Sequence, residues 1–165
     1  MTPIRAISVG VEAPDFELPS SELAANNKPG KKIRLSDYRG DRHVLIAFFP
    51  LAFSPVCTQE VRCLQEDVEK LAATRPVQVL GFSVDSAWTL AAFKGELGLS
   101  YPFVSDFHPK GEVARKYGLY LEEMGITARA TVIVDKAGKV EWVKVQQIPD
   151  PRDMKEICAF LDRLS

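Results

Sequence analysis

Residues 43–57 read HVLIAFFPLAFSPVC, and this stretch decides how the rest of the chain is interpreted. Its first part, His43 to Phe49, is a continuous apolar run, which predicts a strand buried on both faces of a sheet. Pro50 ends this run. The following segment, Pro55 to Ala73, carries apolar residues at helical spacing, namely Val61, Leu64, Val68 and Leu71. The stretch is therefore interpreted as a strand-to-helix junction.

Strands and helices alternate downstream of this junction. Further strands are predicted over 77–84, 101–104, 130–134 and 140–145, and helices over 86–97, 110–117 and 150–164. Helical crossovers allow the first strands to run parallel, whereas the segment 135–139 predicts a hairpin. Residues 20–32 are interpreted as a surface loop. We therefore expect an α/β, thioredoxin-like fold, with a mixed sheet flanked by helices, in a single domain over residues 1–165.

The composition is that of a globular chain, and it excludes some functions. Lys plus Arg number 21 and Asp plus Glu 22, so the net charge of −1 argues against a nucleic-acid binder driven by charge. The sequence contains no run of about 18 apolar residues, so no membrane span is expected. The first ten residues lack the apolar core of a signal peptide. The sequence also has 3 cysteines, an odd number, which argues against a disulfide scaffold. The cysteine count and the lack of a signal peptide together predict a reducing compartment, namely the cytoplasm.

The junction places Cys57 where a thiol can be activated. Ser54 is a favourable N-cap residue and Pro55 a favourable first helical residue, so Cys57 falls in the first turn. The N–H groups of that turn lack intrahelical partners and the helix dipole is positive there, and both favour the thiolate. Cys57 shares a helical stripe with Val61 and Leu64, so its sulfur is expected to point toward the sheet. The alternative is a buried structural cysteine.

Glu60 shares the side of Cys57 and is placed to hold a nearby cation. It also occupies the third position after Cys57, where the Cys-x-x-Cys pattern of a thioredoxin-type dithiol needs a second cysteine. The dithiol interpretation therefore fails. A single thiol in this place is suited to meeting an external oxidant.

The same residues resemble a known family. Pro50-x-x-x-Ser54-x-x-Cys57 is similar to the peroxiredoxin active-site pattern, Pro-x-x-x-Thr/Ser-x-x-Cys. Further motifs follow in family order: Gly10-x-x-Ala13-Pro14-Asp15-Phe16, Leu35-Ser36-Asp37-Tyr38-Arg39-Gly40, Cys57-Thr58-Gln59-Glu60, Val84-Asp85-Ser86 and Arg129-Ala130-Thr131-Val132-Ile133-Val134-Asp135. The chain looks closest to the alkyl hydroperoxide reductase E and bacterioferritin-comigratory-protein branches. The resemblance implies a thioredoxin-like fold with a peroxiredoxin-type N-terminal extension.

The resemblance also implies an activity and roles for individual residues. The protein would be a thiol-dependent peroxidase that reduces hydrogen peroxide and organic hydroperoxides through a Cys57 sulfenic acid. Arg129 would donate hydrogen bonds to the thiolate and the peroxide, which suits the several donors of a guanidinium. Ser54 would bind the peroxide, where the family more often has Thr, and Pro50 would shield the sulfur from water. Glu60 would orient Arg129.

A reductant must then return the sulfenic acid to the thiol. Cys63 follows Cys57 by about 9 Å of helical rise, whereas a disulfide needs Cα atoms within about 7 Å, so their pairing requires the helix to unwind. The local-resolving branch of the family usually has its second cysteine one position earlier, where this chain has Arg62. Cys158 is interpreted as a packed core residue. We expect a one-cysteine cycle with a thioredoxin-like protein or a low-molecular-weight thiol as reductant. Cys63 is the candidate resolving residue, and Cys158 is a second, less favoured alternative.

The family resemblance implies a homodimer, and we expect neither a cofactor nor a metal, because the histidines and cysteines show no ligand spacing. No nucleic-acid or membrane partner is expected. Two other functions stay open. A peroxide sensor or redox relay would use Cys57 and pass the oxidation to a partner protein. A peroxidase differs from such a relay in that it turns over repeatedly. A binding module without redox chemistry is disfavoured by the complete set of Pro50, Ser54, Cys57 and Arg129.

Overall fold

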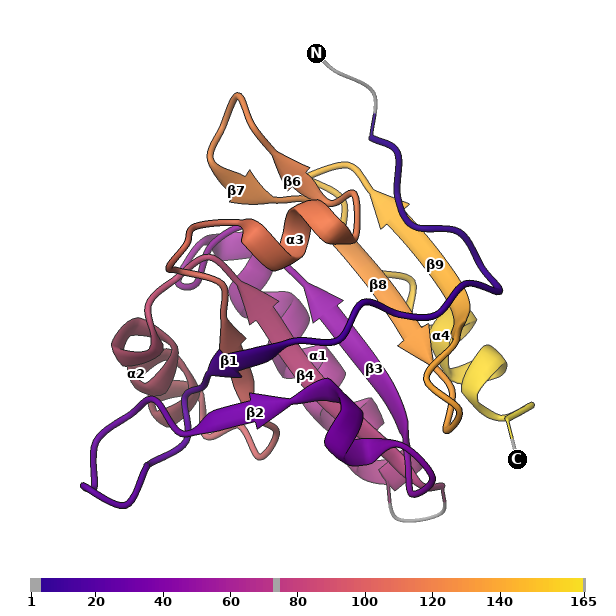
Figure 1. Cartoon of the computed structure of the whole chain (residues 1–165), viewed down its shortest axis with the longest axis horizontal. Helices are drawn as coiled ribbons and strands as arrows, with labels where there is room; N and C mark the ends of the chain where they lie inside the picture. Colours follow the sequence, from indigo (N-terminus) through magenta and orange to yellow (C-terminus); the bar gives the residue numbers. More distant parts are fainter. Residues whose placement is uncertain (1–3, 73–74, 165) are drawn as a thin grey trace.

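The computed structural model of the chain describes residues 4–72 and 75–164, and the side chains of residues 68, 69, 71 and 72 lie outside that description. Its elements are shown in Figure 1. In chain order they are β1 (Glu17–Pro19), β2 (Lys32–Arg34), the 3-10 helix η1 (Leu35–Tyr38), β3 (His43–Phe48), α1 (Pro55–Ala72), β4 (Val77–Ser83), α2 (Ala87–Leu97), β5 (Phe103–Ser105), α3 (Glu112–Lys116), β6 (Tyr120–Leu121), β7 (Ile126–Thr127), β8 (Arg129–Val134), β9 (Val140–Gln146) and α4 (Met154–Leu161).

The central sheet is mixed and has the strand order β5-β4-β3-β8-β9 (Figure 1). Strand β3 runs parallel to β4, with Leu45 opposite Val79, and β4 runs parallel to β5. On its other side β3 pairs antiparallel with β8, which continues into a hairpin with β9. Every residue of β3 and β8 is buried, which explains their apolar sequences, because a central strand of a covered sheet has no solvent face. The predicted α/β class and mixed sheet are confirmed.

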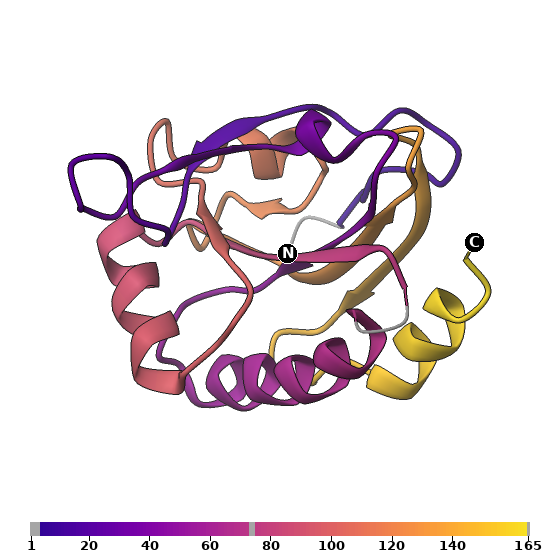
Figure 2. The ribbon, with the colours of Figure 1, turned by 90° about the horizontal axis from the view of Figure 1, so that it is seen from below.

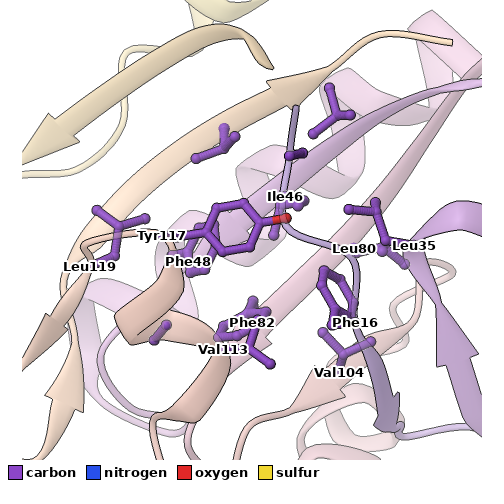
Figure 3. Packing of buried hydrophobic residues seen from close by; sticks show 14 of the residues in the cluster. Phe16, Leu35, Ile46, Phe48, Leu80, Phe82, Val104, Val113, Tyr117 and Leu119 are labelled. Atoms are coloured by element: carbon purple, nitrogen blue, oxygen red, sulfur yellow. The ribbon is translucent and has the colours of Figure 1, made fainter. Parts of the chain in front are cut away.

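The two faces of the sheet are covered by different layers (Figure 2). Helices α1, α2 and α4 cover one face, where Leu64, Phe93 and Ile157 pack on the strands. The other face is covered by α3 and by the N-terminal chain, which crosses it as β1, β2 and η1. Figure 3 shows the core of that second face. There the ring centroids of Phe48 and Phe82 lie 4.4 Å apart. The face covered by α1, α2 and α4 carries the thiol, as described below.

The ends of several predicted elements need correction. The sequence predicts a last helix over 150–164, but α4 begins only at Met154, because the Asp153 carboxylate caps it by accepting the N–H groups of Lys155 and Glu156. The helix predicted over 110–117 begins at Glu112 because the preceding Gly111 has a left-handed φ of 75°. The strand predicted over 101–104 is displaced to β5. Residue 73, the predicted end of α1, lies outside the described residues.

The strand pairs β1–β2 and β6–β7 are not predicted by the sequence. The segment interpreted as a loop over 20–32 joins β1 to β2, and its last residue already belongs to β2. These strands have two or three residues each, too short for an alternating pattern to show. Within residues 4–72 and 75–164, no helix is long and apolar enough to cross a membrane.

Candidate active site

Cys57 lies in the first turn of α1, directly after the loop that leaves β3. The helix begins at Pro55, and the carbonyl of Ser54 accepts the N–H of Thr58 at 2.9 Å, so Ser54 holds the N-cap position. Cys57 is 0% exposed and packs in the core between α1 and the sheet, so the predicted direction of its sulfur is confirmed. The positive end of the helix dipole favours the thiolate at this position.

Arg129 reaches the sulfur from the neighbouring strand. It is the first residue of β8, whose register sets Ala130 opposite Phe48, so Arg129 lies where β3 ends and the loop to Cys57 begins. Its Nη2 donates to the Cys57 Sγ at 3.3 Å, and its Nε donates to the carbonyl of Ile148 at 2.8 Å. Arg129 is buried, so water screens its charge little, and the guanidinium stabilises a negative sulfur.

Glu60 holds two arginines at once. One oxygen of its carboxylate accepts a hydrogen bond from Nη1 of Arg129, and the other accepts the backbone N–H of Arg152 at 2.9 Å. The Nε of Arg152 lies 3.4 Å from that second oxygen. Glu60 stands one helical turn after Cys57, so the carboxylate and the sulfur lie on the same side of α1. The carboxylate therefore fixes the orientation of the guanidinium that contacts the sulfur.

Arg152 is a member of this cluster that the sequence analysis missed. It precedes α4 and is buried, and its Nη1 and Nη2 donate to the carbonyls of Ala130 at 2.8 Å and Phe48 at 2.5 Å. Arg152 thus ties the ends of β3 and β8 to the Glu60 carboxylate. In the sequence it stands in the first turn of the helix predicted over 150–164, between the charged residues Asp150 and Asp153, and an arginine in such surroundings is typically exposed. The pattern gives no signal that this side chain is buried.

The charges of the cluster do not cancel while the thiol is neutral. Arg129 and Arg152 are two buried cations against the single carboxylate of Glu60. Burial lowers the pKa of the Arg152 guanidinium, and the Glu60 carboxylate opposes that shift. Buried charges are costly unless they are paired. A thiolate at Cys57 would supply the second negative charge, and two anions would then face the two guanidinium groups.

Pro50 and Ser54 lie on the loop between β3 and α1. Pro50 is buried and is the second residue after β3, and the hydroxyl of Ser54 donates to the carbonyl of Leu51 at 2.9 Å. Phe53 has a left-handed φ of 68°, which is uncommon for a bulky residue, and its ring packs edge-on against Phe93 at 5.0 Å. The loop is therefore a defined turn that precedes the helix carrying the thiol.

The other two thiols lie apart from this cluster. Cys63 is exposed on α1, which is an unbroken helix from residue 55 to 72, and Cys158 is half-buried on α4. Burial raises the pKa of the Cys158 thiol, and the carboxylates of Asp67 and Asp162 raise it further. All three thiols are free in this structure. The packing predicted for Cys158 is thus only partial.

This geometry defines a class of protein: an α/β protein with one buried thiol at a strand-to-helix junction, which accepts a hydrogen bond from a buried arginine. Comparison with known proteins narrows the class. The model of the AhpC/TSA family matches residues 9–143. Alkyl hydroperoxide reductase E of Mycobacterium tuberculosis is 32% identical over 149 residues, which cover 90% of this chain and 92% of the relative. Peroxiredoxin tpx1 of Schizosaccharomyces pombe is 31% identical, over 95% of this chain and 81% of its own.

A solved structure gives the same result. The reduced 2-Cys peroxiredoxin of Plasmodium vivax superimposes with a TM-score of 0.81 and 28% identity, over 93% of this chain and 80% of that one. The chain therefore belongs to the AhpC/TSA family, and it is a peroxiredoxin with the thioredoxin-like fold of that family. It is accordingly a thiol peroxidase, which implies a peroxide substrate and a thiol reductant.

Proposed function

We propose that Cys57 is the peroxidatic residue and reduces hydrogen peroxide and organic hydroperoxides. The thiolate sulfur attacks the distal peroxide oxygen, and the O–O bond breaks as the S–O bond forms. The leaving oxygen takes a proton and departs as water or an alcohol, and Cys57 is left as the sulfenic acid. The observation that carries this proposal is the hydrogen bond from Arg129 to the Sγ within a cluster that holds one excess positive charge.

The surrounding residues support the same step. Arg129 donates to the sulfur and, in the transition state, to the peroxide oxygens where negative charge develops. Glu60 keeps that guanidinium in place, and Pro50 covers the sulfur against water. The Ser54 hydroxyl already donates to Leu51, and a hydroxyl retains acceptor capacity when its proton is used. We therefore propose that Ser54 accepts a hydrogen bond from the peroxide O–H.

We propose a one-cysteine cycle. An external thiol attacks the Cys57 sulfenic acid to form a mixed disulfide and water, and a second thiol then releases Cys57 and leaves as a disulfide. The arrangement of α1 supports this cycle, because Cys57 is buried and Cys63 is exposed about 9 Å further along an unbroken helix. A thioredoxin-like protein or a low-molecular-weight thiol is the proposed reductant.

We propose that the protein forms a homodimer through the surface next to the site. Leu51, Phe107 and Met124 are exposed large apolar residues that line one cleft of about 350 Å³. Thr89 also lines this cleft, and Trp88, the residue before it in the sequence, is 62% exposed. Exposed apolar surface of this kind favours association. Sedimentation of the wild type and of Met124→Glu, which is expected to shift the equilibrium toward the monomer, tests this proposal.

Two further proposals concern the whole chain. Residues 1–165 are proposed to form one domain, because both cores share strands β3, β4 and β8. A cytoplasmic location is proposed because the three thiols are free, which suits a reducing compartment. Limited proteolysis and cell fractionation test these two points.

The experiment that tests the function is a single turnover. Reduced protein is mixed with one equivalent of hydrogen peroxide, tryptophan fluorescence is followed in stopped flow, and the product is identified by mass spectrometry. Cys57→Ser and Cys63→Ser are run beside the wild type. Trypsin cleaves after Arg62, so Cys57 and Cys63 fall on separate peptides, which shows whether a disulfide joins them.

Rapid oxidation that disappears in Cys57→Ser and leaves a sulfenic acid supports the one-cysteine cycle. A disulfide between the two peptides would instead assign the resolving role to Cys63. Oxidation no faster than that of an ordinary thiol would overturn the peroxidatic role of Cys57. Repeated turnover with excess dithiothreitol distinguishes a peroxidase from a relay, which would form a lasting mixed disulfide with one partner protein.

A further inference from the structure

The loop between β3 and α1 is attached to the neighbouring strand β4 by a carboxylate that the mechanism above does not use. Asp85 follows β4, and its Oδ2 accepts the backbone N–H of Ala52 at 2.8 Å. The same oxygen accepts the hydroxyl proton of Ser83 at 2.7 Å. Ala52 lies midway between Pro50 and Ser54, the two loop residues assigned to the peroxide step.

Asp85 is itself held in place by its surroundings. Its backbone N–H donates to the hydroxyl oxygen of Ser83 at 3.2 Å, and its carbonyl accepts the hydroxyl of Ser105 on β5 at 2.6 Å. The carboxylate therefore has a fixed position relative to two strands of the central sheet. A hydrogen bond from such a group transfers the rigidity of the sheet to the loop.

The loop needs such an attachment because its backbone is strained. Phe53, the residue after Ala52, has a φ of 68°, which L side chains rarely adopt, and it is 49% exposed. A strained backbone persists only where neighbouring contacts hold it. The strand end before the loop is fixed by Thr127, whose hydroxyl donates to the carbonyl of Phe49 at 2.5 Å. The contact from Asp85 acts beyond that point, within the loop itself.

We propose that Asp85 is a positioning residue that holds the Pro50–Ser54 loop closed over the Cys57 sulfur. The proposal rests on the proposed role of Cys57. With the loop closed, Pro50 shields the sulfur and the Ser54 hydroxyl is positioned to bind the peroxide. When the Ala52 contact is lost, the strained turn relaxes, the peroxide geometry is lost, and the buried sulfur becomes accessible to large reagents.

Two measurements on Asp85→Ala test this proposal. The rate constant for oxidation of Cys57 by hydrogen peroxide is expected to fall by roughly tenfold or more, because a small displacement of positioning groups is costly. The rate at which a bulky maleimide labels Cys57 is expected to rise by roughly tenfold, because local opening exposes the thiol. Peptide mass spectrometry reads Cys57 separately from Cys63, since trypsin cleaves after Arg62.

Three variants serve as controls. In Asp85→Asn the amide oxygen can accept the N–H of Ala52, so both rates are expected to return toward the wild type. Ser83→Ala removes the hydroxyl that anchors the Asp85 carboxylate but leaves the contact to Ala52, so both rates are expected to shift in the same direction as in Asp85→Ala, by only about twofold. Asp135→Ala removes a carboxylate that accepts backbone N–H groups in the β8–β9 turn, at the other end of the sheet, and should leave both rates unchanged.

Labelling of Cys158 in the same molecules separates local opening from general unfolding. A rise confined to Cys57, with rescue in Asp85→Asn, supports the proposal. An equal rise at Cys158, or oxidation of Asp85→Ala at the wild-type rate, overturns it. Failure of the wild type to oxidise rapidly would instead overturn the peroxidatic role of Cys57, so the two failures are distinguishable.

Discussion

Cys57 and Cys63 are the same residue type on the same helix, yet the structure gives them opposite surroundings. Cys57 is fully buried and accepts a hydrogen bond from Arg129, whereas Cys63 is exposed to solvent. Six residues of helix turn a side chain by about 120° away from its starting direction, so the two cannot share a face. The reactivity of a thiol on this helix therefore depends on which face of the helix carries it and on the strand that this face packs against.

The largest expected difference comes from removing each thiol in turn. In steady-state turnover with excess dithiothreitol, Cys57→Ser is expected to lose peroxidase activity by at least about a thousandfold, because the nucleophile is gone. Cys63→Ser is expected to stay within about twofold, since the one-cysteine cycle does not use it. A comparable loss in both variants would contradict the separation of the two residues.

The next effect concerns the carboxylate that holds the guanidinium at Cys57. Glu60→Gln removes the negative partner of two buried arginines, and breaking a buried pair in this way costs about 3–5 kcal/mol of stability. Urea unfolding followed by tryptophan fluorescence measures this loss. Glu122→Gln, which breaks an exposed pair with Arg115, is the matched control and should leave the unfolding midpoint unchanged. Equal midpoints for both variants would show that the buried cluster contributes no stability.

A smaller effect is expected when the guanidinium is replaced by another cation. Arg129→Lys keeps a positive charge but loses the fixed set of donors that reaches Cys57, Glu60 and Ile148 together. The rate constant for oxidation by hydrogen peroxide is expected to fall by about a hundredfold. Labelling of Cys63 by iodoacetamide provides the internal reference and should not change. If the oxidation rate is retained in Arg129→Lys, charge alone activates the thiol.

The smallest effect extends the comparison to the third thiol. Burial and two carboxylates raise the pKa of Cys158, so this thiol stays protonated to higher pH than an ordinary cysteine. In Cys57→Ser, the rate of Cys158 alkylation is therefore expected to keep rising with pH beyond the point at which an ordinary thiol levels off, because its thiolate fraction is still growing. A plateau reached below pH 9 would contradict this direction.

The elements with a clear hydrophobic period could be predicted from the sequence, and their ends could not. The apolar run of β3 and the stripe of α1 locate the junction and its thiol, and in the described side chains Val61 and Leu64 are buried as predicted. The side chains of Val68 and Leu71, the rest of that stripe, lie outside the described residues. Helix α4 begins later than the predicted start at residue 150, because the cap at Asp153, rather than the apolar period, decides where that helix begins.

The reactive groups of the site could be predicted from the sequence alone: one thiol in the first turn of a helix, a carboxylate one turn later, and an arginine at the start of a strand. It could not determine which charged groups meet. Arg129 reaches the sulfur because β8 pairs antiparallel with β3 in a register that sets Ala130 opposite Phe48. Arg152 reaches Glu60 from a segment 92 positions away. Such contacts depend on strand register and on how distant segments of the chain pack together. Neither leaves a local pattern in the sequence, so these contacts follow from the folded chain alone.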